Sequence, residues 1–445
     1  MLCLADTQNY KLINLQQSSV TLLIPTPQVP VTSPTLLGSG TQLVPRPLVA
    51  VVRKDEFLVV SGSSDNQTIG IFVNSNGDAI RGTLQWSSYP KALCIEFPYV
   101  AALLRNNTIE IHNILDQNLL QTIPLDASID AKGMTFGHGI KVWIDVLAKR
   151  LKRHVWPPSS QNQENELYDV DLESQLQREI IRYSTAAARI LVFGKDSVMA
   201  QVTTPLVVQV DLLLEKNLVE EAMQLAEQAR NTISSDNNVY VERLRSELSY
   251  TYQKSGLLLL KETVFDDAFT LLSKGDMDPR VVIHMFEGLA QAKWLKESPP
   301  VLLFDGIIAL VEGLGTIKNI VNNSLKDFTK DSDDNDSNEG APEMRRVLLM
   351  NAREALNKYL RTERAKRKDR LGQNDTICKV IDTSLLKIYM SQKDDKAIYQ
   401  LLQQPNDCSI EDCAKALSKS KKYYALSIMY ESKHMYEKVL DIWTK

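Results

Sequence analysis

The hydrophobic and polar positions of this chain follow two different periods. Up to about residue 204, short runs alternate between apolar and polar residues, which is typical of strands. Beyond that point, apolar residues recur at helical spacing. The change is clear in Leu218–Arg230, where one helical face is apolar and the other carries Glu and Gln. The apolar face consists of Leu218, Ala222, Leu225, Ala226 and Ala229. The pattern predicts a β unit joined to a helical array.

Between Cys3 and Pro124, the β part consists of short strand-like runs that are separated by turn residues. Tyr10–Leu15 and Glu56–Gly62 are typical, and Asn76-Gly77 is a strong hairpin-turn signal. Strands this short imply a sandwich, a barrel or the blades of a propeller. The proline-rich tract Pro25–Pro47 predicts a long mobile loop.

Both ends of the pattern suggest an incomplete protein. The strands suffice for about three or four propeller blades, too few to close a ring and protect its edges. We therefore expect further blades before Met1. The helical pattern stops near Trp443 without the polar capping repeat that such arrays need, so further repeats are expected there.

The middle of the chain contains a basic stretch and a polar insertion. Trp143–Trp156 predicts an amphipathic helix whose Lys and Arg residues either contact acidic lipid headgroups or a partner, or form an ordinary solvated face. A polar linker follows at Ser159–Gln175. The hairpin Ala188–Val202 is then expected to close the β domain after an insertion at about 157–187. This gives a β domain over residues 1–204. The basic residues are Lys149, Arg150, Lys152 and Arg153.

Residues 205–445 are predicted to form an α-solenoid of stacked helix pairs. The acidic pair followed by alanine at Glu220–Ala222 returns 46 positions later at Asp266–Ala268. A degenerate repeat of this length is typical of solenoids, in which small residues allow close helix approach. Between two helices, Gly275 suits a C-cap, Asp278 an N-cap and Pro279 the first helical position.

An acidic, polar stretch at about 328–343 is predicted to be a disordered loop within the solenoid. It lacks the glycine that a calcium-binding EF-hand loop places sixth, and we do not expect calcium there. The basic helix end Arg361–Arg370 is either a solvated face or a partner of this acidic loop.

Composition limits the possible functions. The chain has 445 residues and a net charge of −4, which implies two or three domains and argues against a general nucleic-acid binder. The longest apolar runs, such as Leu206–Leu214, fall short of a membrane span, and Met1–Leu12 does not resemble a secretory signal. Its five scattered cysteines fit a reducing cytosolic compartment.

The sequence offers no recognisable catalytic, cofactor or metal site. The five histidines lack ligand partners at metal-site spacing, and we expect His284 to be packed or half-buried in a helix. Cys408 and Cys413 lack a second pair, so zinc is not expected. Phosphate-loop, dinucleotide and nucleophile-elbow motifs are absent from the sequence. We predict no enzyme activity, no cofactor and no small-molecule substrate. The histidines are His112, His138, His154, His284 and His434.

Three stretches of the β part resemble the later blades of a citron-homology domain. They are GIFVNSNGDAIRGTLQW at Gly70–Trp86, FPYVAAL at Phe97–Leu103 and IEIHNILDQNLLQTIPL at Ile109–Leu125. Trp86 and Tyr99 are expected to be core anchors. Gln117 and Gln121 are expected to satisfy backbone groups at a blade corner.

The helical part is similar to vacuolar sorting tether subunits of the transforming growth factor-β receptor-associated and Vam-type family. The similarity rests on the order of several stretches, of which SKGDMDPRVVIHMF at Ser273–Phe286 is the clearest. The others are Ala352–Leu360, Val380–Tyr389 and Gln403–Cys413 with the helix pair that follows it.

This resemblance implies a function in membrane tethering. It implies a non-enzymatic subunit of an endosomal or vacuolar tether, of the CORVET type with the HOPS type as alternative. Such a subunit binds partner subunits and a Rab GTPase, and is cytoplasmic and peripheral on endosome or vacuole membranes. Two further hypotheses are a citron-homology scaffold of small-GTPase signalling and a self-assembling, clathrin-like coat component. The matching motifs serve packing and capping, so the partner-binding residues are unknown.

Overall fold

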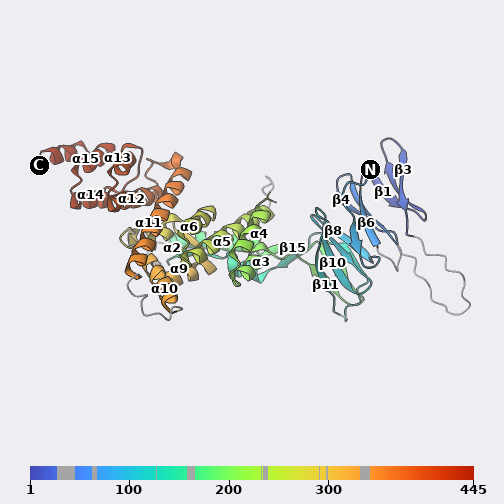
Figure 1. Ribbon diagram of the computed structural model, residues 1–445. Helices are drawn as coiled ribbons and strands as arrows, with labels where there is room; N and C mark the ends of the chain where they lie inside the picture. The colour runs from blue at the N-terminus through green and yellow to red at the C-terminus, as the bar shows by residue number, and fades with distance from the viewer. Residues whose placement is uncertain are drawn as a thin grey trace, which may run out of the picture. The chain divides into compact units, whose positions relative to one another are not determined.

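The computed structural model describes residues 1–27, 46–62, 68–126, 128–157, 166–231, 233, 239–289, 291–296, 299–330 and 341–444. It divides into two compact units (Figure 1). The β unit comprises Met1–Trp143 with Ala186–Thr203, and the helical unit comprises Ile144–Thr185 with Thr204–Lys445. Sheets in the N-terminal part and helices in the C-terminal part confirm the predicted β + α class.

The β unit is built from antiparallel sheets whose strands mostly follow one another in the chain. One sheet contains β1 (Leu2–Ala5), β2 (Asn9–Asn14) and β3 (Ser19–Pro25). The second contains β4 (Val49–Arg53), β5 (Glu56–Ser61), β6 (Thr68–Asn74) and β7 (Leu84–Trp86). The third contains β8 (Ala92–Glu96), β9 (Tyr99–Leu103), β10 (Thr108–Asn113) and β11 (Leu119–Pro124). In the fourth, β16 (Ile190–Phe193) is the central strand and pairs with both β12 (Gly133–Phe136) and β17 (Val198–Gln201). The short strands β13 (Lys141–Trp143) and β15 (Thr185–Ala187) pair with each other near the ends of the two chain segments.

Trp86 anchors the core of this unit. Its side chain is 2% exposed and lies against Gly70 of β6, where a Cβ atom would come within 2.7 Å of the indole. The glycine is therefore needed for the indole to reach this position. The prediction for Trp86 is confirmed, whereas Tyr99 is only half-buried.

The two glutamines at the predicted blade corner behave differently. Gln117 adopts a positive φ of 61° and donates its side-chain amide to the Ile114 carbonyl at 2.8 Å, which confirms its predicted role. Gln121 is exposed on β11, and no hydrogen bond of its side chain is seen within the described part of the chain.

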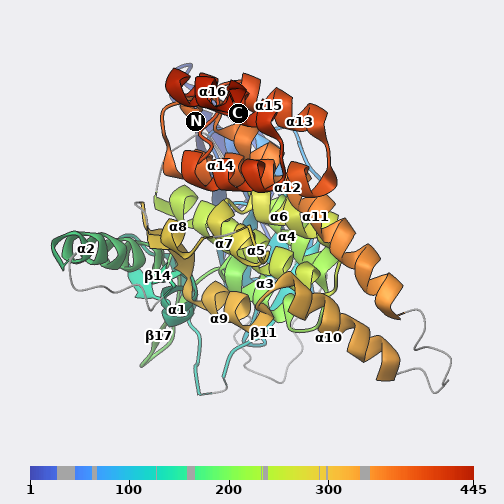
Figure 2. The same cartoon turned by 90° about the vertical axis from the view of Figure 1, so that its left-hand side faces the viewer.

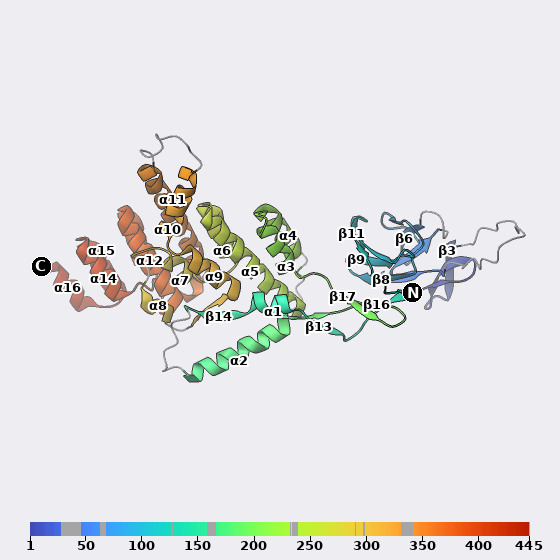
Figure 3. The same cartoon turned by 90° about the horizontal axis from the view of Figure 1, so that it is seen from below.

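The helical unit begins with α1 (Asp145–Leu151), α2 (Glu166–Tyr183) and a two-stranded ribbon of β14 (Arg153–Trp156) and β18 (Val301–Phe304). From α3 onward the unit is built from helices, with α3 and α4 at one end and α14, α15 and α16 at the other (Figure 3). They are α3 (Leu206–Leu214), α4 (Val219–Asn231), α5 (Val239–Lys261), α6 (Phe265–Lys274), α7 (Pro279–His284), α8 (Ala292–Lys296), α9 (Asp305–Leu314), α10 (Ile317–Lys330), α11 (Ala341–Lys366), α12 (Thr376–Gln392), α13 (Asp395–Gln403), α14 (Ile410–Lys419), α15 (Tyr423–Ser432) and α16 (Tyr436–Trp443).

Helices that are adjacent in space pack through small residues at some positions. Helix α5 lies on α6, α6 on α11 and α11 on α12, while α12–α16 stack together at the end of the unit (Figure 2). Ala222 of α4 and Ala268 of α6, the two equivalent positions of the predicted repeat, have no exposed surface. Small side chains at these positions allow the close helix approach that the repeat predicted.

The corner between α6 and α7 has the predicted capping geometry. Gly275 is the C-cap of α6 and donates its N–H to the Leu271 carbonyl at 2.9 Å. The Asp278 carboxylate caps α7 by accepting the Arg280 N–H at 2.9 Å, and Pro279 occupies the first turn. These three predictions are confirmed because each depends on local geometry alone.

The basic stretch Trp143–Trp156 does not form one helix. Helix α1 ends at Leu151, and β14 then pairs in register with β18, with Arg153 opposite Phe304 and Trp156 opposite Val301. The predicted single helix is wrong because a strand far along the chain competes for these residues, and its hydrogen bonds outweigh local periodicity.

The polar linker predicted at Ser159–Gln175 is also wrong in part, since α2 begins at Glu166. Leu172, Leu176 and Ile180 lie four residues apart and form the more buried side of this helix. The polar residues between them hid this apolar stripe in the sequence.

Two predicted loops fall largely outside the described residues. Of the tract Pro25–Pro47, residues 28–45 are not described. The acidic loop is predicted at about 328–343, but α10 extends to Lys330 and α11 begins at Ala341. Residues 331–340, with the calcium-like sequence, lie outside the described part.

Candidate interaction surface

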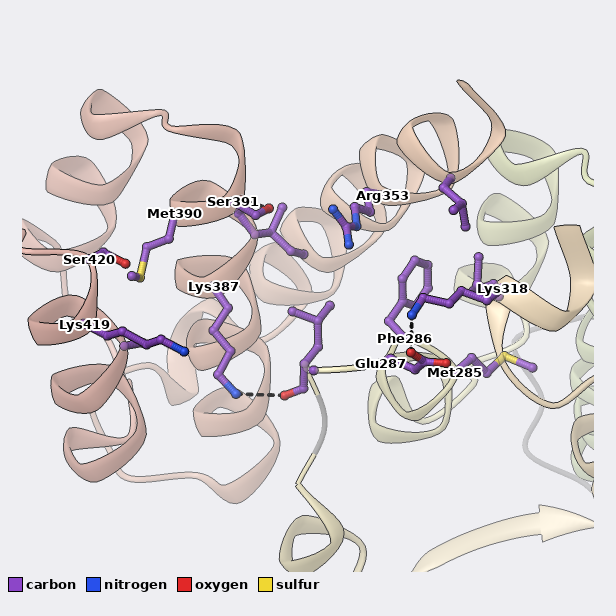
Figure 4. A pocket seen from close by; sticks show the side chains of 16 residues that line it. Met285, Phe286, Glu287, Lys318, Arg353, Lys387, Met390, Ser391, Lys419 and Ser420 are labelled. Atoms are coloured by element: carbon purple, nitrogen blue, oxygen red, sulfur yellow. Dashed lines mark hydrogen bonds and ion pairs between the residues drawn. The ribbon is translucent and has the colours of Figure 1, made fainter. Parts of the chain in front are cut away.

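A groove of about 390 Å³ opens in the helical unit where five segments meet (Figure 4). The segments are the turn after α7, the start of α10, the middle of α11, and the ends of α12 and α14. Lining residues of these segments include Met285–Leu289, Ile317, Lys318, Leu349, Arg353, Lys387, Ile388, Met390, Ser391, Ala416, Lys419 and Ser420.

The floor of the groove is apolar and belongs to the main core of the unit. Met285, Phe286 and Ile317 are at most 6% exposed. The chain can turn here because Gly288 adopts a φ of +82°, which favours glycine. The Ile317 N–H donates to the Met285 carbonyl at 2.9 Å and fixes the start of α10 beside the turn.

The rim is basic, although the whole chain carries a net charge of −4. Lys318 forms an ion pair with Glu287, the acidic residue of the lining. Lys387 donates from Nζ to the Leu289 carbonyl at 3.1 Å and lies 5.4 Å from the Trp294 ring centroid. Arg353 and Lys419 are exposed and form no ion pair with any residue that the structure describes.

One nearby carboxylate moderates this charge. Burial alone would raise the pKa of Asp412 on α14, but hydrogen bonds from Gln291 and Ser409 lower it, with help from Lys293 and Lys387. The Asp412 carboxylate thus partly offsets the positive field of Lys387. Arg353 and Lys419 are the rim cations whose charge is less compensated by nearby carboxylates.

The basic helix end Arg361–Arg370 pairs with buried carboxylates of the helical unit. Arg364 binds Asp382 of α12 at 2.7 Å, and Lys366 binds Glu363 at 2.9 Å. Burial raises the pKa of the Asp382 carboxyl, while the nearby guanidinium and the Asp407 N–H oppose that rise. Neither sequence interpretation, a solvated face or a partner of the acidic loop, anticipated these contacts.

The basic residues near α1 are also engaged within the unit. Arg150 binds the buried Asp211 of α3 at 2.9 Å, and Lys254 binds the same carboxylate at 2.6 Å. Arg153 pairs with Glu179 of α2. These contacts give two of the four basic residues of the stretch a structural role, which weakens the interpretation as a lipid-binding face.

The histidines and cysteines are dispersed. Across the described ranges, no group of three or more His, Cys, Asp or Glu residues could hold a metal ion. His284 is predicted to be packed or half-buried, but it is exposed at the end of α7, and its ring lies edge-on to Trp156 with the ring centroids 5.4 Å apart. Cys408 and Cys413 are buried free thiols. No helix within the described residues is both long and apolar enough to cross a membrane.

The described part of the chain thus combines a β unit with a unit of packed helices that carries an open groove. Comparison with known proteins shows which protein families the chain is similar to. The family model "VPS3 N-terminal domain" matches residues 1–126, and the model "Vacuolar sorting protein 39 domain 1" matches residues 381–445.

Full-length relatives agree with these two matches. Human transforming growth factor-beta receptor-associated protein 1 is 24% identical over 89% of this chain, and vacuolar protein sorting-associated protein 3 of Schizosaccharomyces pombe is 22% identical over 100% of this chain. Human Vam6/Vps39-like protein is 24% identical over 60% of this chain. These matches confirm the resemblance to the receptor-associated and Vam-type family. The chain spans only 35% of the human receptor-associated protein, 46% of the S. pombe protein and 27% of the Vam6/Vps39-like protein.

Proposed function

We propose that this chain belongs to a non-enzymatic subunit of a CORVET-like tether that acts in vesicle-mediated transport to endosomes or the vacuole. The observation that carries the proposal is the order of the two family models on one chain. A VPS3 N-terminal match covers residues 1–126 of the β part, and a Vps39 domain 1 match covers residues 381–445 at the end of the helical part. Relatives named for vacuolar sorting align across both.

The coverage of the relatives favours the CORVET branch. The S. pombe and Saccharomyces cerevisiae Vps3 proteins align with 99–100% of this chain, but the Vam6/Vps39-like protein with only 60%. The Vps39 domain 1 match at residues 381–445 keeps the HOPS-type assignment as the alternative.

The proposed mechanism is avidity on one scaffold. In this proposal, the sheets of the β unit are blades of a citron-homology propeller and the helical unit is an α-solenoid. Each bears separate surfaces for a Rab GTPase and for other tether subunits, and the protein is cytoplasmic and peripheral on the membrane. Several weak contacts on one chain raise the overall affinity without any single tight site.

The second candidate is a citron-homology scaffold of small-GTPase signalling. Such proteins join this domain to catalytic domains, whereas here packed helices follow the β unit.

The third candidate, a clathrin-like coat component, would polymerise by itself. Sedimentation of the purified chain tests it, because large regular polymers without partners would contradict the tether proposal.

The decisive experiment is a pull-down of the purified chain with a panel of Rab proteins and tether subunits. Each Rab is loaded with GTP or GDP, and we expect retention of at least one in the GTP form only. Retention by CORVET-specific but not HOPS-specific subunits would assign the branch, and the reverse would favour the alternative. Binding to no Rab and to no tether subunit would contradict the proposal.

A further inference from the structure

The groove of the helical unit combines a recessed apolar floor with a cationic rim on both sides. In Figure 4, Lys387 and Lys419 extend from α12 and α14, and Lys318 and Arg353 extend from α10 and α11 across from them. The lining also includes core side chains such as Phe286, which lies beside Lys318. We propose that this groove binds an acidic peptide segment of a partner protein. An apolar side chain of the segment enters the groove, and its carboxylates face the rim.

Charge complementarity selects the occupant. The lining holds four basic side chains and one acidic side chain, in a chain whose net charge is negative. Arg353 and Lys419 have no carboxylate partner among the described residues, so an acidic ligand would meet them without displacing an existing ion pair. Complementary charge steers encounter and fixes orientation, while the apolar anchor supplies most of the affinity.

The recessed floor favours a peptide over a membrane surface. A lipid bilayer is contacted by apolar side chains that protrude, as on an interfacial helix. Here Met285, Phe286 and Ile317 are at most 6% exposed, whereas Arg353 and Lys419 of the rim are exposed. A groove bounded by helices accepts an amphipathic helix or an extended segment whose anchors project inward.

Binding of an acidic peptide by the groove does not depend on a role in tethering. The chain could bind an acidic peptide even if no Rab protein bound to it, and a Rab could bind even if the groove did not take a peptide. The two proposals therefore fail separately.

The test uses the complete chain and a synthetic probe. The probe is a fluorescein-labelled peptide of about 18 residues, or five helical turns, with Leu along one helical face and Glu elsewhere. Fluorescence anisotropy measures its binding, and the comparison peptide has the same composition in scrambled order. We expect the patterned peptide to bind more tightly and its affinity to fall as NaCl rises.

Two matched double variants locate the site. Arg353→Glu with Lys419→Glu reverses the unpaired rim charges and should weaken binding about tenfold, because attraction becomes like-charge repulsion. Arg345→Glu with Lys415→Glu makes the same charge change on the same two helices at exposed positions outside the lining. This control should stay within about twofold of the parent chain. Arg353→Gln with Lys419→Gln repeats the test without introducing negative charge.

Each outcome decides the proposal. Loss of binding in the rim variants but not in the control supports it. Equal binding by all variants, or by the scrambled peptide, overturns it. Vesicles containing phosphatidylserine are tested in parallel. If the chain binds these vesicles through Arg353 and Lys419 but does not bind the peptide, the groove is a membrane-contact site and the peptide proposal is wrong.

Discussion

Arg364 of α11 donates its Nε–H to Oδ1 of Asp382 on α12 over 2.7 Å, and the Asp382 side chain has no exposed surface. The other carboxylate oxygen accepts the Asp407 N–H at 2.8 Å, while Arg364 also donates to the Pro405 carbonyl at 2.8 Å. One ion pair thus joins two helices to the segment that leads into α14. A buried pair of this kind is costly to break from one side, because the remaining charge loses its partner.

Asp382→Ala should therefore lower the free energy of unfolding of the helical unit by about 3–5 kcal/mol. Arg364→Ala combined with Asp382→Ala should cost less than the sum of the two single variants, since no lone charge is left. Urea denaturation followed by circular dichroism gives the four values of this double-mutant cycle.

The control is Asp395→Ala, which removes an exposed carboxylate paired with Lys422 in the same part of the unit. An exposed pair contributes about 0–1 kcal/mol, so this variant should be nearly as stable as the parent chain. Equal losses for Asp395→Ala and Asp382→Ala would show that the buried pair has no special role.

Two helical glycines should respond to alanine in opposite directions. A Cβ on Gly256 of α5 would lie 2.9 Å from the Ala268 carbonyl oxygen and 2.9 Å from Leu272 Cγ of α6. Gly256→Ala should therefore destabilise the unit by about 1–3 kcal/mol through overpacking. Gly313 of α9 has nothing within 4 Å of its Cβ position, and Gly313→Ala should stabilise by about 0.5–1 kcal/mol. Thermal unfolding of the two variants measures this difference, and stabilisation by Gly256→Ala would refute the close α5–α6 approach.

The features that the sequence predicted correctly are those that depend on residues close together in the chain. The caps at Gly275 and Asp278 could be placed because a helix end needs particular residue types within a few positions. Trp86 was recognised as a core residue, but its dependence on Gly70 emerges only from the pairing of β6 with β7.

Long-range pairings could not be predicted in the same way. The β14–β18 ribbon joins Arg153 to Phe304, about a third of the chain apart. The sequence of a short apolar run does not indicate which distant strand it pairs with.

The groove could not be predicted from local sequence because five separate segments form it. One signal was present, since Lys318, Arg353, Lys387 and Lys419 recur at intervals of 35, 34 and 32 residues. Equivalent positions of a stacked repeat fall on the same face, so this spacing could have indicated a shared basic surface.

Glu363 of α11 should make stability depend on acid pH. Its carboxylate accepts hydrogen bonds from Ser273 of α6 at 2.7 Å and from Lys366 and Arg367. Burial alone would raise the pKa of Glu363, but these hydrogen bonds outweigh it and hold the pKa below the ordinary 4.5. A lowered pKa contributes stability that is complete above about pH 4.5 and is lost as the pH falls through the folded value.

Glu363→Gln should therefore cost about 1.5–3 kcal/mol near neutral pH, and the difference from the parent chain should shrink below pH 4.5. Urea titrations at several pH values give this difference directly. Glu354→Gln, an exposed change on the same helix, should show no such dependence. A difference that persists unchanged at low pH would contradict the proposed charge of Glu363.

His112 should make the β unit sensitive to a milder acidification. Its ring is buried in β10 and lies edge-on to Trp86, with ring centroids 6.0 Å apart. Burial lowers the pKa of His112 from its ordinary 6.5, although a hydrogen bond with the Gln85 backbone acts in the opposite direction. Since the folded pKa is below the unfolded one, stability is complete above pH 6.5 and declines as the pH falls, by at most about 1.4 kcal/mol per pH unit for one proton.

Hydrogen exchange of the β9 and β10 segments, corrected for the intrinsic rate at each pH, measures this loss within the β unit. Protection should fall from pH 7 to pH 5.5 in the parent chain and stay more nearly constant in His112→Gln, which has no ring to protonate. His138→Gln changes an exposed histidine of the same unit and should follow the parent chain. If His112→Gln lost protection with pH as steeply as the parent chain, another group would have to carry the titration.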